Sequence, residues 1–162
     1  MTSEPMSSEP MTTEPMPTEP TTHEPTTAAA TAKNRKDPAY LFTEKQVAEK
    51  SEIARRFLDN RARLNENVHK ADNLLVKRFY ILDHNTYLEG ALPAKYKELM
   101  GLAASACLRC DDCIYYHAIQ SYRLGVTRAE QEEAINVAVV VGGSIVIPHI
   151  RRAYELLTEL YG

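Results

Sequence analysis

The sequence has only three cysteines and no tryptophan, and all three cysteines lie between residues 107 and 113. An odd number of cysteines in one short segment cannot form the disulfide framework of a small secreted scaffold. Hydrophobic runs are short as well. The most apolar stretch, residues 134–141, is followed by Gly142 and Gly143 and falls well short of the ~20 residues that a membrane span needs. The first residues lack the basic segment and apolar core of a secretory signal. We therefore expect a cytoplasmic protein in which neighbouring cysteines serve redox or metal chemistry.

The chain also lacks a large excess of charge. Its formal net charge is −3, and residues 1–25 contain five glutamates but no lysine or arginine, so residues 26–162 carry a net charge of +2. A body so close to neutral gives no electrostatic argument for binding nucleic acid. No nucleotide or flavin motif is present, so we expect no bound redox cofactor.

Residues 1–25 are five tandem pentads that each end in Glu-Pro: MTSEP, MSSEP, MTTEP, MPTEP and TTHEP. Proline at every fifth position removes helix donors, and four methionines are the only side chains with hydrophobic bulk. The period is also far shorter than the roughly 20–50 residues of a solenoid repeat. We predict that residues 1–37 form a disordered tail and linker, and that residues 38–162 form one folded domain.

From Leu41 onward the pattern is helical, with no convincing strand. Capping boxes that begin at Thr43 and Thr127 open two of the helices. Pro93 and Pro148 suit first turns, and Gly125 suits the position after a helix end. The expected helices cover about residues 43–64, 68–82, 94–108, 111–124, 127–142 and 147–161. About six helices in one domain predict an all-α fold with bundle-like packing.

Two of these helices carry notable apolar positions. The helix over residues 68–82 places four of them at helical spacing, namely Leu74, Leu75, Phe79 and Leu82. In the helix over residues 127–142, four residues project in too many directions for the core of one protomer: Val137, Ala138, Val140 and Val141. That helix therefore either contributes to a subunit interface or is fully buried at the centre of the domain.

The cysteine segment holds the main candidates for chemistry. On a helix, Cys110, Cys113 and His117 fall at positions i, i+3 and i+7 and so project from one face. The first two lie at a predicted helix N-terminus, where unpaired N–H groups and the helix dipole stabilise a thiolate. His117 lies one turn beyond Cys113 and could accept or relay a thiol proton. The pattern predicts thiol chemistry; the alternative is that the cysteines are small buried hydrophobes and the histidine is an ordinary polar residue.

Two further residues are ambiguous. Glu98 lies twelve residues before Cys110 and can reach the thiols only if its helix packs against the next one. From the residues alone, a surface position beside two lysines is the expectation for Glu98. Cys107 extends the motif, and with Cys110, Cys113 and His117 it could form a zinc or Fe–S ligand set. The simpler expectation for Cys107 is a small core residue among neighbouring alanines.

Four segments then follow one another in a familiar register: residues 92–99, the Cys110-x-x-Cys113-x-x-x-His117 motif, residues 124–130 and residues 141–149. Together they resemble the carboxymuconolactone decarboxylase family, specifically its AhpD-like alkylhydroperoxidase branch, over about residues 70–160. The resemblance implies an all-helical protomer that assembles as a homotrimer or hexamer. It also implies peroxidase and disulfide reductase activity without a metal or cofactor.

The resemblance assigns roles to individual residues. Cys113 corresponds to the thiol that attacks the peroxide, Cys110 to the resolving thiol, and Glu98 and His117 to a proton relay. The implied partners are a hydroperoxide or disulfide substrate and a dithiol reductant, such as a lipoyl-bearing or thioredoxin-like protein. Where the peroxidases often have a second histidine, this chain has Asp112.

Two acids between the cysteines should oppose thiolate formation, so peroxidase turnover is expected to be weaker while disulfide exchange persists. Two alternatives from other functional classes remain open. One is a zinc or Fe–S module formed by Cys107, Cys110, Cys113 and His117. The other is a non-catalytic oligomeric scaffold whose N-terminal tail recruits a partner.

Overall fold

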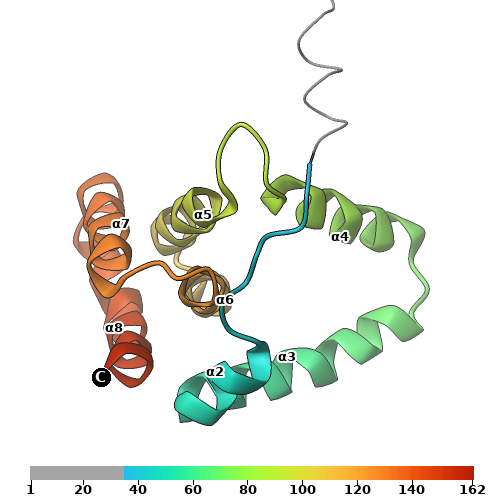
Figure 1. Cartoon of the computed structure of the whole chain (residues 1–162), viewed down its shortest axis with the longest axis horizontal. Helices are drawn as coiled ribbons and strands as arrows, with labels where there is room; N and C mark the ends of the chain where they lie inside the picture. Colours follow the sequence, from blue (N-terminus) through green and yellow to red (C-terminus); the bar gives the residue numbers. More distant parts are fainter. Residues whose placement is uncertain (1–34) are drawn as a thin grey trace, which may run out of the picture.

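The computed structural model describes residues 35–162. The predicted disordered tail therefore falls almost entirely outside the described residues. The described part contains seven α-helices, one short 3-10 helix and no strand beyond the isolated bridge between Lys36 and Glu89 (Figure 1). The helices are α2 (Glu44–Lys50), α3 (Glu52–Lys70), α4 (Leu74–Tyr87), α5 (Ala94–Leu108), α6 (Asp111–Arg123), α7 (Arg128–Gly142), the 3-10 helix η1 (Ser144–Val146) and α8 (Ile147–Tyr161). The predicted all-α fold is confirmed.

Local sequence signals place most helix ends. Thr43 and Thr127 each form a complete capping box, with the side chain accepting from the third helical residue and the partner side chain accepting from the cap backbone. Pro148 occupies the first turn of α8. Gly125 follows α6 with a positive φ of 75°, the conformation for which glycine is favoured. The ranges predicted for α5 to α8 agree with the structure to within about one residue, the accuracy to which helix ends are defined.

The first predicted helix is in fact two helices, because the backbone at Ser51 is extended (φ −132°, ψ 122°). The Ser51 hydroxyl accepts a hydrogen bond from the Ala54 N–H (3.0 Å) and so caps α3. The same hydroxyl donates to Glu159 Oε2 on α8 (2.7 Å). A contact so distant in sequence outweighs the continuous helical pattern, and α3 then runs on to Lys70, past the predicted end at residue 64.

The second predicted helix was also misplaced. Residues 68–70 belong to α3, and Asp72 has a positive φ of 50° that ends any helical path. Asn73 then caps α4, its side-chain oxygen accepting from the N–H groups of Leu75 (2.9 Å) and Val76 (3.3 Å). The predicted range of 68–82 therefore becomes Leu74–Tyr87.

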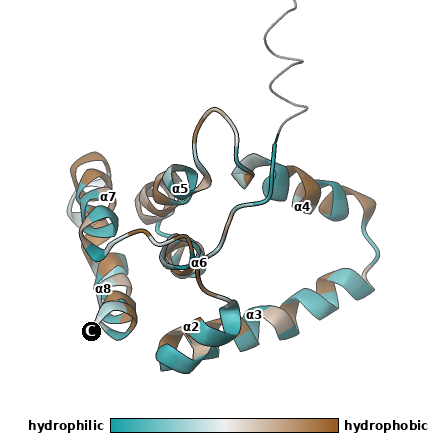
Figure 2. Ribbon diagram, in the orientation of Figure 1, coloured by the Kyte–Doolittle hydropathy of each residue, from teal (hydrophilic) through white to brown (hydrophobic). Residues whose placement is uncertain are grey.

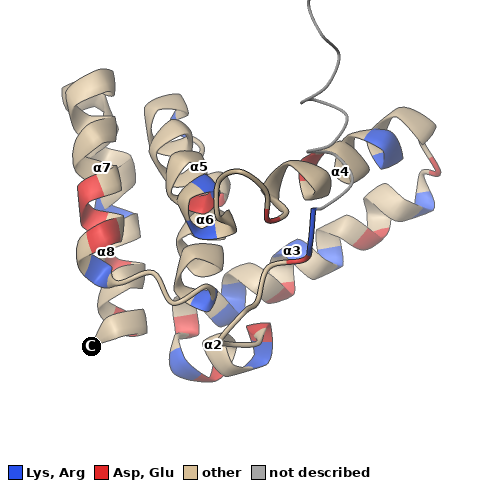
Figure 3. Ribbon diagram, turned by 45° about the horizontal axis from the view of Figure 1, so that its top comes forward, with Lys and Arg blue, Asp and Glu red and all other residues tan. Residues whose placement is uncertain are grey.

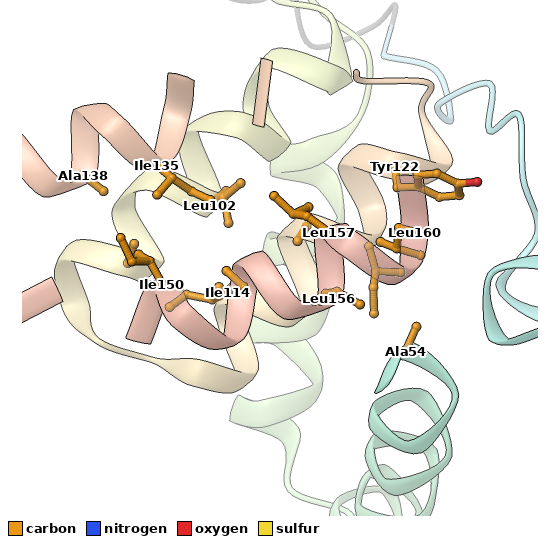
Figure 4. Close-up of a cluster of buried hydrophobic side chains, with 14 of the residues drawn as sticks. Ala54, Leu102, Ile114, Tyr122, Ile135, Ala138, Ile150, Leu156, Leu157 and Leu160 are labelled. Atoms are coloured by element: carbon orange, nitrogen blue, oxygen red, sulfur yellow. The ribbon is translucent and has the colours of Figure 1, made fainter. Parts of the chain in front are cut away.

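The hydrophobic core lies among α5, α6, α7 and α8 (Figure 4). α5 packs against both α6 and α7, and α8 packs against α6. The largest aliphatic side chains of this core are fully or almost fully buried: Leu102, Ile114, Ile119, Ile135, Leu156, Leu157 and Leu160. Burial of each such side chain contributes about 1.5–3 kcal/mol to the stability of the fold, so these four helices hold the side chains on them in stable positions.

By contrast, α3 and α4 extend away from α7 and α8 (Figure 1). Acidic and basic residues are interspersed along α2 and α3 (Figure 3), and α3 has one buried residue, Ala54. No residue of α4 is buried. Figure 2 shows brown, hydrophobic positions along α4. Five apolar side chains of this helix are exposed by 58–72%: Leu74, Leu75, Phe79, Ile81 and Leu82. The helical spacing of these residues is thus present, but nothing within residues 35–162 covers them.

A second exposed apolar surface lies at the C-terminal half of α7. Val137, Val140 and Val141 are 58%, 85% and 73% exposed, whereas Ala138 is buried. The alternative of a fully buried α7 is therefore wrong. The subunit-interface alternative stays a prediction. Among residues 35–162, no helix has the length and hydrophobicity needed to cross a membrane.

Candidate functional site

A disulfide between Cys110 and Cys113 lies where α5 turns into α6. The chain reverses at Arg109, which has a left-handed backbone conformation (φ 60°). Cys110 is then the N-cap of α6, and its Sγ accepts a hydrogen bond from the Cys113 N–H (3.3 Å). The two Cα atoms are 5.2 Å apart, within the usual range for a disulfide of about 4.4–6.8 Å. The turn thus brings both sulfur atoms to the N-terminus of α6.

Glu98 and His117 form a buried pair between α5 and α6. The Oε2 atom of Glu98 lies 2.7 Å from the Nδ1 atom of His117, and the two residues are only 2% and 9% exposed. The expectation of a surface position for Glu98 is wrong, because α5 packs directly against α6 and turns this side chain inward. Lys95 and Lys97, which suggested a polar surface, direct their amino groups elsewhere, to Glu130 and to the carbonyl oxygen of Leu88.

The environment of this pair changes its proton affinity. Burial raises the pKa of Glu98, while the hydrogen bond and charge of His117 act in the opposite direction and do not outweigh it. Two tyrosine rings flank the imidazole, those of Tyr87 and Tyr116, each with its centroid 5.3 Å from that of His117. Burial, assisted by the negative charge of Glu98, raises the pKa of Tyr116 to about 12. The phenol therefore stays protonated beside the imidazole at neutral pH.

Gly101 makes room for the imidazole. A Cβ atom at this position would lie 2.6 Å from both Cε1 and Nδ1 of His117. Atoms do not approach so closely without displacement, so the backbone of α5 passes the ring only because residue 101 has no side chain. Sequence reasoning missed this residue, although a glycine inside an otherwise helical pattern is a signal of close packing.

Cys113 and His117 open into one cavity of about 320 Å³. Part of its wall comes from α3, which supplies five side chains: Phe57, Asn60, Arg61, Leu64 and Asn65. The guanidinium of Arg61 lies over the ring of Tyr116, 4.5 Å from its centroid. A neighbouring cavity of about 730 Å³ shares Phe57, Asn60 and Asp112 with the first. The contribution of α3 was not predicted, because its amphipathic pattern shows an apolar side without showing what that side faces.

The two acids between the cysteines have different surroundings. Asp111, the first residue of α6, receives two side chains from α8: His149 Nδ1 lies 2.8 Å from its Oδ1, and Arg152 forms an ion pair with its Oδ2. Asp112 is exposed and lines both cavities. The two acids were expected to oppose a thiolate together, but the charge of Asp111 is compensated by α8.

Cys107 lies apart from this site. It belongs to α5, is half-buried against the core, and its Sγ lies 3.5 Å from the carbonyl oxygen of Ala138 on α7. Within residues 35–162, no three or more His, Cys, Asp or Glu side chains are arranged as a metal site. The chain reversal at Arg109 separates Cys107 from the first turn of α6. The predicted alternative of a zinc or Fe–S ligand set therefore has no geometric basis in the described part of the chain.

The model of the carboxymuconolactone decarboxylase family matches residues 74–156, from α4 into α8. The chain belongs to the carboxymuconolactone decarboxylase family. The match includes the Glu98–His117 pair and the disulfide, whereas α2 and α3 lie before it.

Solved structures of one relative agree with this membership. A crystal structure of a Thermotoga maritima protein shares 51% sequence identity, covers 65% of this chain and 92% of its own, and superposes with a TM-score of 0.63. A second structure of that protein, with a TM-score of 0.62 and 89% of its chain covered, is described as a carboxymuconolactone decarboxylase family protein with a suggested involvement in an antioxidative response.

Two curated relatives are named as uncharacterised proteins. The relative in Paracoccus denitrificans, protein 4 in the cox locus, is 30% identical over 84 residues, which are 52% of this chain and 76% of that protein. The relative in Cupriavidus necator is 36% identical over 55 residues, and the match spans 34% of this chain but only 49% of that protein.

Proposed function

We propose that this family member is a thiol-dependent peroxidase and disulfide oxidoreductase of the AhpD-like type. The observation that carries the proposal is the cavity shared by Cys113 and His117, behind which His117 is hydrogen-bonded to the buried Glu98. A nucleophile within reach of a base that a third residue orients is the arrangement required for an activated thiol. Cys110 supplies the second sulfur that lets the oxidised thiol be recovered.

In the first step, the Cys113 thiolate attacks the terminal oxygen of a hydroperoxide. The O–O bond breaks, Cys113 becomes a sulfenic acid, and the alkoxide leaves as an alcohol after it takes up the proton that the thiol gave up. Because His117 lies one helical turn beyond Cys113, its imidazole can carry that proton from sulfur to oxygen. The developing thiolate also lies at the N-terminus of α6, where the helix dipole favours a negative charge.

In the second step, the Cys110 sulfur attacks the sulfenic sulfur of Cys113, and hydroxide leaves as water after it takes up the Cys110 proton. The product is the disulfide present in the structure, which represents the oxidised form of the cycle. An external dithiol then transfers two electrons and two protons to the disulfide and is itself oxidised. The reductant that the family resemblance implies is a lipoyl-bearing or thioredoxin-like protein.

Glu98 acts on this cycle through His117. Its carboxyl group holds the imidazole at Nδ1, and this leaves Nε2 as the nitrogen that exchanges protons with the cavity. Because burial raises the pKa of Glu98, its carboxyl group holds a proton more readily than an exposed glutamate does, so it can take part in proton exchange with the imidazole. The suggested antioxidative involvement of the Thermotoga maritima relative supports the same type of chemistry.

We further propose that the protein assembles as a homotrimer or hexamer. The uncovered apolar faces of α4 and α7 support this proposal, since exposed patches of this kind mark protein contacts more often than free surface. The alternative of a non-catalytic scaffold would have the same assembly. Oxidation of the thiols by a hydroperoxide distinguishes an enzyme from a scaffold, because a scaffold needs no reactive disulfide.

The test is a thiol count on the reduced protein before and after a small excess of an organic hydroperoxide, read by intact mass. We expect the loss of two titratable thiols and a mass decrease of two hydrogen atoms. Cys113→Ser should abolish this change, whereas Cys107→Ser should retain it because Cys107 lies outside the site. Unchanged thiols in the parent protein, or full turnover in Cys113→Ser, would refute the assignment.

A further inference from the structure

The contact between α8 and the first turn of α6 reaches the redox pair from outside the cavity. Asp111 follows Cys110 directly in the chain and precedes Cys113 by two residues. His149 and Arg152 both bind its carboxylate. None of these three side chains lines the cavity of Cys113 and His117. These side chains therefore lie near the disulfide without contacting a substrate in that cavity.

The charges of this group bear on the reduced state of the cysteine pair. Reduction converts a neutral disulfide into thiols, one of which ionises readily at a helix N-terminus. An unpaired Asp111 carboxylate beside that thiolate would disfavour reduction by like-charge repulsion. Arg152 places a positive charge against the same carboxylate, and the His149 ring fixes its position. Asp112 forms no ion pair within the described residues, so variants of Arg152 or His149 leave the effect of its charge on the thiolate unchanged.

We propose that Arg152 and His149 act through Asp111 to set the reduction equilibrium of the Cys110–Cys113 disulfide. They are positioning residues: they keep an acid at the start of α6 while cancelling its effect on the thiolate. The proposal rests on the proposed redox role of the pair. The reaction concerned is the exchange of the protein disulfide with an external dithiol, which yields the protein dithiol and the oxidised, cyclic disulfide of the reagent.

The test is the equilibrium of the full-length protein with reduced and oxidised dithiothreitol at about pH 9, where a thiolate is populated. The remaining protein thiols are counted by mass after acid quenching and alkylation. We expect Arg152→Gln to shift the equilibrium constant towards the disulfide by about 3- to 10-fold, the scale on which one unit charge acts on a neighbouring group in a largely solvated site. A tenfold shift corresponds to about 30 mV in reduction potential.

Matched variants separate charge from structure. Asp111→Asn should shift the equilibrium towards the dithiol, opposite to Arg152→Gln. His149→Gln removes the ring that fixes the carboxylate but leaves the charge of Arg152, so it should shift the equilibrium in the direction of Arg152→Gln by a smaller factor. Arg151→Gln, at a neighbouring exposed position without a contact to Asp111, should leave it unchanged. In the Asp111→Asn background, Arg152→Gln should have a smaller effect, because only the direct attraction between Arg152 and the thiolate remains.

An equal shift from Arg152→Gln with and without Asp111 would overturn the proposal, as would no shift in the parent background. A merely structural role would lower the unfolding midpoint of each variant without the opposite signs. The two proposals also fail differently. A disulfide that cannot be reduced and reformed at all refutes the redox function, whereas a reversible disulfide insensitive to Arg152 refutes only this inference.

Discussion

The backbone of Gly101 on α5 lies so close to the imidazole of His117 on α6 that no side chain fits between them. A methyl group at residue 101 would lie 2.6 Å from two ring atoms. Because the ring is also enclosed by Tyr87 and Tyr116, it cannot move aside without disturbing them. The position of the proposed proton relay therefore depends on the absence of one side chain.

We expect Gly101→Ala to displace the His117 ring and break its hydrogen bond to Glu98. Overpacking of this kind costs about 1–3 kcal/mol in the free energy of unfolding. It should also slow hydroperoxide-driven disulfide formation by at least about tenfold, because a positioned proton relay usually accelerates a reaction by about 10²- to 10⁴-fold. Urea denaturation measures the change in stability, and thiol counts on samples quenched at successive times measure the change in rate. In Gly90→Ala, where the nearest atom is 3.7 Å away at the flexible end of Lys97, neither quantity should change.

Glu98→Gln should change how stability depends on pH. The raised pKa of Glu98 means that the folded protein retains this proton over a range in which the unfolded chain, with a pKa of about 4.3, has released it. Stability is therefore lost as the pH rises from that value through the raised pKa of the folded state. The glutamine variant cannot ionise and should not show this loss. As the pH rises, its free energy of unfolding should therefore increase relative to that of the parent protein.

Urea titrations at several values between about pH 4 and about pH 8 test this difference. The hydroperoxide reaction of the same variant should be slow at every pH, because the amide holds His117 in place but cannot exchange a proton with it. Parallel stability curves for the two proteins would contradict the assignment of a raised pKa. An unimpaired rate would contradict the proton relay.

Ser51→Ala should lower stability without affecting the disulfide chemistry. The Ser51 hydroxyl caps α3 and donates to Glu159 on α8, so its loss removes a cap and a long-range hydrogen bond together. The expected cost is about 1–3 kcal/mol in the free energy of unfolding. Thr43→Ala removes an exposed cap without a tertiary contact and should cost less. An equal loss in the two variants would show that the link to α8 contributes nothing.

The apolar face of α4 provides a test of assembly. Phe79→Glu replaces a side chain that is 63% exposed, so it should leave the fold of an isolated protomer intact. It should nevertheless dissociate a trimer or hexamer whose contact includes this face, because a carboxylate buried at an interface lacks a partner. Light scattering after size-exclusion chromatography measures the mass. Arg78→Glu, at an exposed charged position on the same helix, serves as the control, and an unchanged mass in Phe79→Glu would exclude this face from the contact.

The sequence predicted α5 to α8 well because their ends carry local signals. The capping box at Thr127, Gly125 after α6 and Pro148 in α8 each act over one turn. The two errors in helix boundaries have different causes, one tertiary and one local. Ser51 interrupts the first predicted helix and is held by a hydrogen bond to Glu159 on α8, which no local pattern shows. Asp72 and Asn73 form a short turn that the periodicity of apolar residues does not reveal.

The site itself was only partly accessible from sequence. Spacing placed Cys110, Cys113 and His117 on one helix, but the burial of Glu98 depends on how α5 packs on α6. The partnership of Asp111 with Arg152 joins residues 41 positions apart, so no local pattern could show it. From the residues alone Glu98 was expected at the surface, and it was the family resemblance that assigned it to a proton relay.

The cavity wall contributed by α3 has a consequence for how new specificities could arise. Both cysteines, Glu98 and His117 lie inside the family-matched segment, whereas Phe57, Arg61 and Leu64 come from a helix before it. The proposed reactive groups and part of the wall that a substrate would contact therefore lie on different segments of the chain. Exchange of α3 alone would therefore change which substrates fit the cavity without altering the residues proposed to carry out the reaction.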